Sequence, residues 1–533
     1  MSVFLRKKGL SSLGKLSWGW SFVWLVAWVA LLPPLDAMDY AHVVALAKER
    51  SENPYQARRC NPGSPVALLD YDSYRAISFR EDRTLWKDQG TDFRLQLFHL
   101  GHYFTDPVRI NLHDRGGMQP ISSSEDWFDY SRSHLDFTNY ESEGFAGFRI
   151  LSSLVNPDGR WDELGSFLGA SYFRLLGADQ SYGLSARGLA INTAHDELDE
   201  EFPIFVEHWF QEPKGCESKL SFYSLMDGPS VCGAYSFTVQ PGRTTVAKVK
   251  ATLFFRNEVE RVGIAPLTSM FWIGKTGERT FRDYRPEVHD SDGMLVHFDS
   301  GEILWRPLVN GSELRTSVFE ANDVRGFGLM QRERNFRQYE DLWNPYHRTP
   351  SLFIEPEGSW GRGRVWLVEF PTTREIDDNV VLFWEPESNP QAGDRLEFSY
   401  KMSWLKQSEK RLSPNRVVAT RTGGGQDFGK NAAVANQERM FAIEFTGPKL
   451  RSLLKQSLEP GQEAPQIEVV ASSYPEHRIT SALCVPNPHN RSWRAMLRVN
   501  LGASDPPPSM ELRCFLKLGD EVMSETWSYL WSP

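Results

Sequence analysis

The sequence is poor in cysteine, which limits how its fold can be held together. Its 533 residues contain five cysteines, at positions Cys60, Cys216, Cys232, Cys484 and Cys514. So few cysteines in a large chain cannot form a disulfide framework, and the odd number leaves at least one thiol unpaired. The spacings of Cys216–Cys232 and Cys484–Cys514 permit bridges, but spacing alone establishes neither. No CxxC or Cys/His spacing indicates a zinc site, and we expect no metal and no other cofactor.

The chain also lacks an excess of positive charge. It has 59 Lys and Arg against 69 Asp and Glu, a formal net charge of −10. This balance offers no electrostatic surface for nucleic acid, so we expect no nucleic-acid partner. No internal repeat of about 20–50 residues is present, which argues against solenoids and propellers. With 41% hydrophobic and 24% charged residues, the composition is that of a globular protein with large cores.

A long apolar run occurs at the N-terminus alone. Basic residues within the first 15 positions precede an apolar run from Trp18 to Leu32, and this run is shorter than the ~20 residues that a membrane span needs. Pro33-Pro34 and the small-residue exit Leu35-Asp36-Ala37 follow it. The pattern predicts a secretory signal peptide over residues 1–37, with an uncleaved anchor as the alternative. After cleavage we expect an exported protein without stable membrane insertion.

Alternation of apolar and polar residues dominates the rest of the chain. From Ala247 to Phe255 the odd positions are apolar while Lys248 and Lys250 face the other side, and Trp493 to Val499 alternates in the same way. Such segments, separated by turn clusters rich in Gly, Pro and Asp, are typical of half-buried strands in antiparallel sheets. The sequence therefore predicts an all-β fold of stacked sheets.

One stretch is the best candidate for a domain boundary. Residues Glu385 to Asp394 read EPESNPQAGD, in which two prolines and no apolar pattern interrupt the strands. We therefore expect a large β-sandwich over residues 38–386 and a linker over 387–394. The size of the remaining segment, 395–533, fits an immunoglobulin-like β-sandwich.

The familiar hydrolase and kinase motifs are missing from the sequence. We find no nucleophile elbow, Walker loop, dinucleotide fingerprint or HExxH motif. Cleavage of a glycosidic bond needs none of them. It needs two carboxyl groups, one to protonate the leaving oxygen and one to activate water. It also needs aromatic and polar side chains that hold sugars by their apolar faces and hydroxyl edges.

Two acidic stretches have a composition that suits this chemistry. The first is Asp283–Gly293, which reads DYRPEVHDSDG, and the second runs from Glu375 through Asp377 and Asp378 into an apolar strand. An ordinary Asx-type turn is the alternative for the first and a solvated loop for the second. Between them lie aromatic residues with polar neighbours, each of which could belong to a core instead: Trp305, Tyr339, Trp343, Tyr346 and Trp360.

A family resemblance connects these stretches. Long motifs of the first domain resemble those of the periplasmic glucan biosynthesis proteins OpgG and OpgD, also called MdoG and MdoD. They include GFAGFR at 144–149, FLGASYFRLLG at 167–177, YGLSARGLAI at 182–191, GIAPLTSMF at 263–271, DYRPEVHDSDG at 283–293, LWRPL at 304–308, RGFGLMQRERNF at 325–336 and PSLFIEPEG at 350–358. The second domain matches more loosely, and residues 408–439 depart from the family pattern.

The resemblance implies both a fold and a function. The implied fold is a galactose-mutarotase-like β-sandwich, which carries a glucan cleft, followed by an immunoglobulin-like domain. The implied activity is that of an inverting glycoside hydrolase on β-1,2-glucan. Asp378 matches the position of the general acid and Asp290 that of the general base, which is thought to act through a relay of hydroxyl and water. The implied location is the periplasm, with β-1,2-glucan and the inner-membrane glucan synthase as partners.

The chemistry makes demands on the two aspartates and their surroundings. Asp378 must hold a proton near neutral pH, which burial or a nearby Asp377 or Glu375 favours, and Asp290 must be ionised, which His289 or Arg285 would favour. Asp377 itself departs from the family pattern, in which Asn is more usual. The residues expected to bind substrate are Tyr284, Arg285, His289, Trp305, Tyr339, Trp343, Tyr346 and Trp360.

Functions of different classes compete for these observations. The first is an enzyme that trims or remodels osmoregulated periplasmic glucan by hydrolysis or transglycosylation. The second is a non-catalytic scaffold that binds nascent glucan and assists the membrane synthase. Retention of a carboxyl group at both positions favours the enzyme. Addition of β-1,6 branches is a weaker third hypothesis, since no nucleotide-binding motif is present to hold an activated donor.

Overall fold

A computed structural model describes most of the chain beyond the N-terminal segment. It covers residues 38–532 except 115–116, 124, 134–136, 138–141, 157, 216, 277–282, 407–409, 425–436, 460–464 and 503–508. The expected signal peptide, residues 1–37, lies outside the described residues. Within the described part, no helix combines the length and the apolar character required to span a bilayer.

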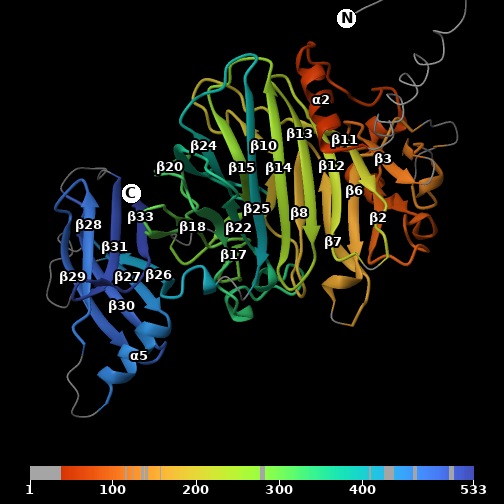
Figure 1. Cartoon of the computed structure of the whole chain (residues 1–533). Coiled ribbons are helices and arrows are strands. Elements are labelled where there is room, and N and C mark those ends of the chain that lie inside the picture. Colours follow the sequence, from red (N-terminus) through yellow and green to blue (C-terminus); the bar gives the residue numbers. More distant parts are fainter. Residues whose placement is uncertain are drawn as a thin grey trace, which may run out of the picture.

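The first domain is built from two large sheets that face each other (Figure 1). In spatial order the ten-stranded sheet contains β2 (Phe93–Phe98), β6 (Gly147–Ser152), β7 (Asp162–Leu168), β8 (Tyr172–Leu175), β9 (Ser185–Arg187), β15 (Val262–Ser269), β24 (Val380–Pro386), β23 (Arg362–Glu369) and β20 (Arg315–Asn322), with β10 (Leu189–Ile191) also paired to β15. The opposing sheet contributes β19 (Ile303–Pro307), β18 (Gly293–His297), β21 (Gly326–Met330), β22 (Ser351–Pro356), β25 (Arg395–Leu405), β14 (Thr245–Phe255), β13 (Val231–Gln240), β12 (Leu220–Asp227), β11 (Ile204–Gln211), β3 (Arg109–Asp114) and β4 (Gly117–Pro120).

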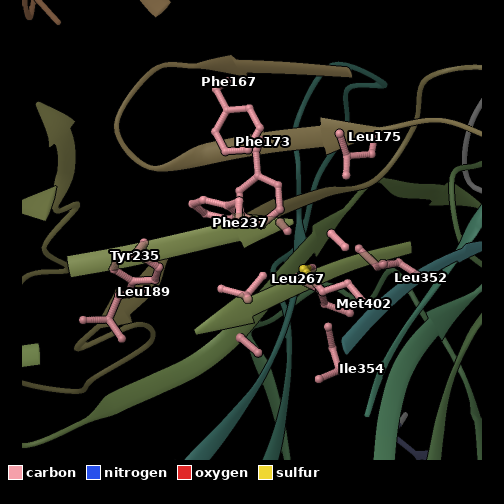
Figure 2. Close-up of a cluster of buried hydrophobic side chains, with 14 of the residues drawn as sticks. Phe167, Phe173, Leu175, Leu189, Tyr235, Phe237, Leu267, Leu352, Ile354 and Met402 are labelled. Carbon is pink, nitrogen blue, oxygen red and sulfur yellow. The ribbon is translucent and has the colours of Figure 1, made fainter. Parts of the chain in front are cut away.

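Aromatic side chains fill the space between the two sheets. Figure 2 shows Phe167 and Phe173 of the ten-stranded sheet directed toward Phe237 of β13. The Phe167 ring centroid lies 4.9 Å from that of Phe173 and 5.2 Å from that of Phe237. Because side chains alternate along a strand, burying Phe173 turns Tyr172 and Arg174 to the outer face of the sheet. The outer face therefore carries the polar residues described below.

Short elements complete the first domain. The helix α2 (Tyr40–Ser51) is capped at its N-terminus by Asp39, whose side chain accepts a hydrogen bond from the His42 amide at 2.9 Å. Its buried residues, Val43 and Ala47, pack on the outer face of the larger sheet (Figure 1). The other short elements are α3 (Tyr71–Ala76), the 3-10 helices η1 (Pro65–Leu68), η2 (Glu81–Arg83), η3 (Glu125–Trp127), η4 (Ser153–Val155), η5 (Phe336–Gln338) and η6 (Tyr346–Arg348), and the paired strands β1 (Ser78–Phe79) with β5 (Phe128–Asp129) and β16 (Phe271–Ile273) with β17 (Val288–His289).

The second domain is a smaller sandwich at the other end of the molecule (Figure 1). A four-stranded sheet faces three strands and one two-residue strand that continue the larger sheet, around a core that includes Phe441, Trp493 and Trp527. Its elements are β26 (Arg416–Gly424), β27 (Glu438–Thr446), α5 (Pro448–Ser457), β28 (Glu468–Tyr474), β29 (Ile479–Asn487), β30 (Ser492–Asn500), β31 (Met510–Leu518), β32 (Glu521–Val522) and β33 (Thr526–Trp531). The predicted all-β architecture is confirmed.

The boundary between the domains differs from the expected one. The expected linker, 387–394, is a turn between β24 and β25, and β25 pairs along its length with β14 and β22 in the middle of the large sheet. Residues 395–405 therefore belong to the first domain, and the chain enters the second domain after Leu405. The two domains are also joined by β33, which pairs in parallel with β19 at Leu304 and Trp305.

The described cysteines carry free thiols. Cys60, Cys232, Cys484 and Cys514 are all unbridged, whereas Cys216 lies outside the described residues. The Cys484–Cys514 bridge is therefore not formed. Cys514 is buried in the core of the second domain, and burial raises its thiol pKa. It behaves as a small apolar core residue.

Candidate active site

The two aspartates are brought together by strands that meet at the edge of the outer sheet face. Asp290 directly follows β17, which pairs with β16, and its backbone amide donates to the Met270 carbonyl at 2.9 Å. Asp378 stands shortly before β24, which pairs with β15. Because β15 leads through Met270 into β16, both aspartates are attached to the same end of one strand.

Asn379 ties the two aspartate-bearing segments to each other. Its side chain is 3% exposed. The Asn379 Oδ1 atom accepts from the Phe271 amide at 2.8 Å, and Nδ2 donates to the carbonyls of Phe271 at 3.1 Å and Phe370 at 2.9 Å. The backbone of Phe271 is in register with His289, the residue before Asp290. One amide group therefore fixes Asp378 relative to Asp290.

Asp290 is a buried carboxyl group in a tightly packed position. It is 9% exposed, and a Cβ atom placed on Gly183 would lie 2.9 Å from its Oδ1 atom and 2.1 Å from Thr349 Cγ2. Glycine at 183 is thus what allows the backbone to approach the carboxyl group. Burial, followed by repulsion from Asp378, raises the pKa of Asp290 to about 8, although Arg174 opposes the shift.

Asp378 is more open and has a cationic neighbour. Its side chain is 35% exposed, and its Oδ2 atom lies 3.8 Å from Nη2 of Arg174. Desolvation by the surrounding protein raises the Asp378 pKa, while Arg174 and Arg187 oppose the rise and Asp377 adds to it. The contribution of Asp377 is the smallest of these, because its charge is offset by Arg374 at 2.5 Å and it also accepts from Thr372 at 2.7 Å. The expected elevation of the Asp378 pKa is therefore found, with burial as its main cause.

Arg285 binds three acidic residues beside the site, which we call the acidic frame, and it does not pair with Asp290. Its guanidinium group donates to Asp283 at 2.9 Å, to Asp341 at 2.7 Å and to Glu375 at 2.7 Å. Burial of Glu375 is outweighed by hydrogen bonds from Arg285 and Tyr346, so its pKa is lowered. The expectation that Arg285 or His289 keeps Asp290 ionised is wrong, because their charged or polar groups are engaged elsewhere.

Several residues expected to contact substrate lie in cores. His289 and Tyr339 have no exposed surface, and Trp305 is 4% exposed beneath the guanidinium group of Arg332. His289 bonds to Gln331 and Glu287 at 3.0 and 3.1 Å, and the half-buried Trp360 packs against Trp384, Phe398 and Tyr400. Tyr346 and Arg285, 5% and 8% exposed, support the acidic frame. These six side chains stabilise the fold around the site and do not form a sugar-binding surface.

Two of the expected binding residues do lie at the surface. Trp343 is 92% exposed and Tyr284 is 75% exposed. Trp343 is held in a turn whose amides at 343 and 344 both donate to Asp341 Oδ1 at 2.8 Å. Because Asp341 and Glu375 share Arg285, this turn is joined to the segment that carries Asp378. Leu342 and Ile376, which are neighbours of Trp343 and Glu375 in sequence, are also strongly exposed, and we call these four exposed apolar residues the rim.

Sequence reasoning assigned no role to three residues that shape the site. They are Gly183, Asn379 and Arg174, which lies on β8 and donates from Nε to Ser185 Oγ at 2.6 Å. Arg174 and Gly183 stand in the motifs FLGASYFRLLG and YGLSARGLAI, and the arginine could have been noticed as a charged residue alternating with buried Phe173. Among the described residues, no group of His, Cys, Asp and Glu is arranged to hold a metal ion.

These features define a two-domain, all-β protein with paired carboxyl groups on the outer face of its larger sandwich. The family model described as "Periplasmic glucan biosynthesis protein, MdoG" matches residues 38–531. The match covers nearly the entire chain, and the chain belongs to this family. The resemblance seen in the sequence motifs is confirmed, and the protein is a periplasmic protein of glucan biosynthesis.

The three hydrogen bonds of the Asn379 side chain, which we call the Asn379 clamp, lead to a prediction about stability. We expect Asn379→Asp to lower the free energy of unfolding by about 3 kcal/mol, because two buried carbonyl groups lose their amide donor. Urea denaturation at pH 7 measures the change. The matched control, Asn389→Asp on the exposed turn after β24, should change stability by less than about 0.5 kcal/mol. Equal stability of the two variants would contradict the proposed clamp.

The raised pKa of Asp290 leads to a second prediction. Its pKa of about 8 in the folded protein exceeds the ordinary value of about 3.9. The folded state therefore retains a proton that the unfolded chain releases, so this group lowers stability as pH rises from about 4 to 8. We expect Asp290→Asn to stabilise the protein by up to about 5 kcal/mol at pH 8 and hardly at pH 4.

Thermal and urea unfolding across this pH range check that expectation. Asp377→Asn is the control, because the hydrogen bond from Arg374 lowers the pKa of Asp377 and its removal should give no gain. A pH-independent effect of Asp290→Asn, or a loss of stability at pH 8, would show that Asp290 does not carry the raised pKa.

Proposed function

We propose that the protein cleaves or remodels the β-1,2-glucan backbone of periplasmic glucans as an inverting glycoside hydrolase or a related transglycosylase. In this proposal Asp378 protonates the glycosidic oxygen as the sugar leaves. Asp290 accepts the proton of the attacking water through a hydroxyl and water relay. The substrate is nascent glucan supplied by the inner-membrane synthase.

One observation carries the proposal. Two carboxyl groups from separate segments repel each other electrostatically, and both have raised pKa values. Burying such a pair lowers stability, so its presence beside an accessible surface is typical of a site that uses protons. Asp378 retains enough exposure to meet a glycosidic oxygen, whereas the more buried Asp290 suits action through a relay.

The exposed rim supplies surfaces that suit sugar rings. Trp343 and Tyr284 present aromatic side chains to solvent from loops fixed by Arg285 and Asp341. Fixed aromatic rings can pack against the apolar faces of pyranose units without losing much conformational entropy. The rim includes Ile376, which stands two positions before Asp378. We therefore assign the rim to the part of the glucan that extends beyond the cleaved bond.

Substitution of either aspartate tests the catalytic proposal. We expect Asp378→Asn to lower the rate of cleavage of linear β-1,2-glucan by roughly 10²–10⁴-fold, because the leaving oxygen loses its proton donor. Asp290→Asn should cause a comparable loss. Chromatography of digests measures the products, and circular dichroism verifies the fold. Glucan binding without any product, even at high concentrations of the wild type, would instead support the scaffold function.

Substitution of the rim tests the assignment of the binding surface. In the Asp378→Asn background, Trp343→Ala should weaken binding of long β-1,2-glucan about 5–10-fold, since an aromatic contact contributes roughly 1 kcal/mol. Isothermal titration calorimetry measures the affinity. Tyr474→Ala, which removes a 76% exposed aromatic residue of the second domain, is the control and should leave the affinity unchanged. Equal affinities for both variants would refute the rim assignment.

A further inference from the structure

Arg174 is the cation that faces both aspartates. Cross-strand pairing places it in a polar row on the outer sheet face, between Arg149 and Ser166 on one side and Ser185 on the other. Its Nη2 atom lies 3.8 Å from Asp378 Oδ2, and its charge also opposes the protonation of Asp290. Within the described parts of the chain, the carboxylate in ion-pair range of Arg174 is that of Asp378.

The other charged groups around the two aspartates either form ion pairs with other residues or repel the aspartates. Asp378 also faces Arg187, which is bound to Glu200 at 2.6 Å, and Asp377, which is bound to Arg374. Asp290 also faces Glu375, which is bound by Arg285. Two neutral phenols complete the surroundings, those of Tyr346 beside Asp290 and Tyr172 beside Asp378. Arg174 is therefore the cation whose charge acts mainly on the two aspartates.

The pair is asymmetric with respect to this cation. Asp378 is in direct range of Arg174, while Asp290 is deeply buried and has no ion-pair partner among the described residues. A negative charge is consequently more favourable on Asp378 than on Asp290. When the pair shares one proton, Arg174 therefore favours the form with that proton on Asp290.

We propose that Arg174 is a positioning residue that stabilises the ionised form of Asp378 in the free enzyme and thereby sets the pH range in which the aspartate pair works. The inference rests on the proposed acid–base function of the two aspartates. An inverting step leaves the acid ionised and the base protonated, which is the distribution that Arg174 favours. Before the next cleavage, one proton must pass from Asp290 to Asp378, so no external donor is needed.

The pH dependence of glucan cleavage tests this inference. Loss of the positive charge in Arg174→Gln should raise both apparent pKa values of the coupled pair, because each carboxyl group loses a stabilising cation. We expect both limbs of the kcat/KM profile to move to higher pH by about one unit. Arg174→Lys should restore much of the original profile. A role limited to packing or to the Ser185 hydrogen bond would lower the rate equally at every pH.

Arg149 provides a matched control for this experiment. It lies in the same row, its side chain is 37% exposed compared with 41% for Arg174, and it faces Glu163 at 3.7 Å. Arg149→Gln should leave both limbs in place. Unmoved limbs in Arg174→Gln, or equal shifts in the two variants, would overturn the inference.

A readout that needs no activity separates this inference from the proposed function. The stability difference between the wild type and Asp290→Asn, followed against pH, reports the pKa of Asp290. Repeating the comparison in the Arg174→Gln background should move its midpoint up by about one pH unit, and an unmoved midpoint would refute the charge effect. If the midpoint moves but the wild type cleaves no glucan, the hydrolytic function fails while the electrostatic control by Arg174 stands.

Discussion

The geometry of the site depends on three hydrogen bonds of one buried amide. Asn379 accepts from the Phe271 amide and donates to the carbonyls of Phe271 and Phe370. The two aspartates are far apart in sequence and belong to different hairpins, so local propensity does not fix their relative position, and the strand that both hairpins pair with needs the side chain of Asn379 to hold their ends together. A side-chain amide can bond both to a backbone N–H group and to backbone carbonyl groups at the ends of strands, and it adds no charge. Asparagine next to Asp378 therefore joins the segments without further perturbing the carboxyl groups.

The charges around the site are divided between two arginines. Arg285 forms ion pairs with Asp283, Asp341 and Glu375. These carboxylates balance its charge, and the ion pairs fix the loops that carry the exposed rim. Arg174 has fewer competing partners and acts on the aspartate pair instead. Because Asp290 remains buried without an ion partner among the described residues, the fold carries an electrostatic cost there. Such costs are tolerated where a function requires them and are offset by the large apolar core.

The sequence was sufficient to predict those parts of the fold that depend on residues close to one another along the chain. Alternation along Ala247–Phe255 correctly indicated a strand, although residues 251–255 are buried on both faces, and the motifs identified the family. The position of β25 was not predictable because EPESNPQAGD has the composition of a linker as well as of a turn between strands. The burial of Trp305 and Tyr339 could not be predicted either, since an aromatic residue with polar neighbours suits both a core and a sugar-binding surface. Non-local pairing decides between these possibilities.

The same non-local contacts connect the second domain to the site. Arg332 pairs with the buried Glu525 of the second domain at 2.6 Å and covers the ring of Trp305. The amides of Arg332 and Glu333 donate to Asp292 Oδ2 at 3.0 and 2.9 Å, two residues beyond Asp290. Removing one partner of a buried ion pair leaves an uncompensated charge, which is strongly destabilising. The position of the second domain is thus coupled to the segment that carries Asp290.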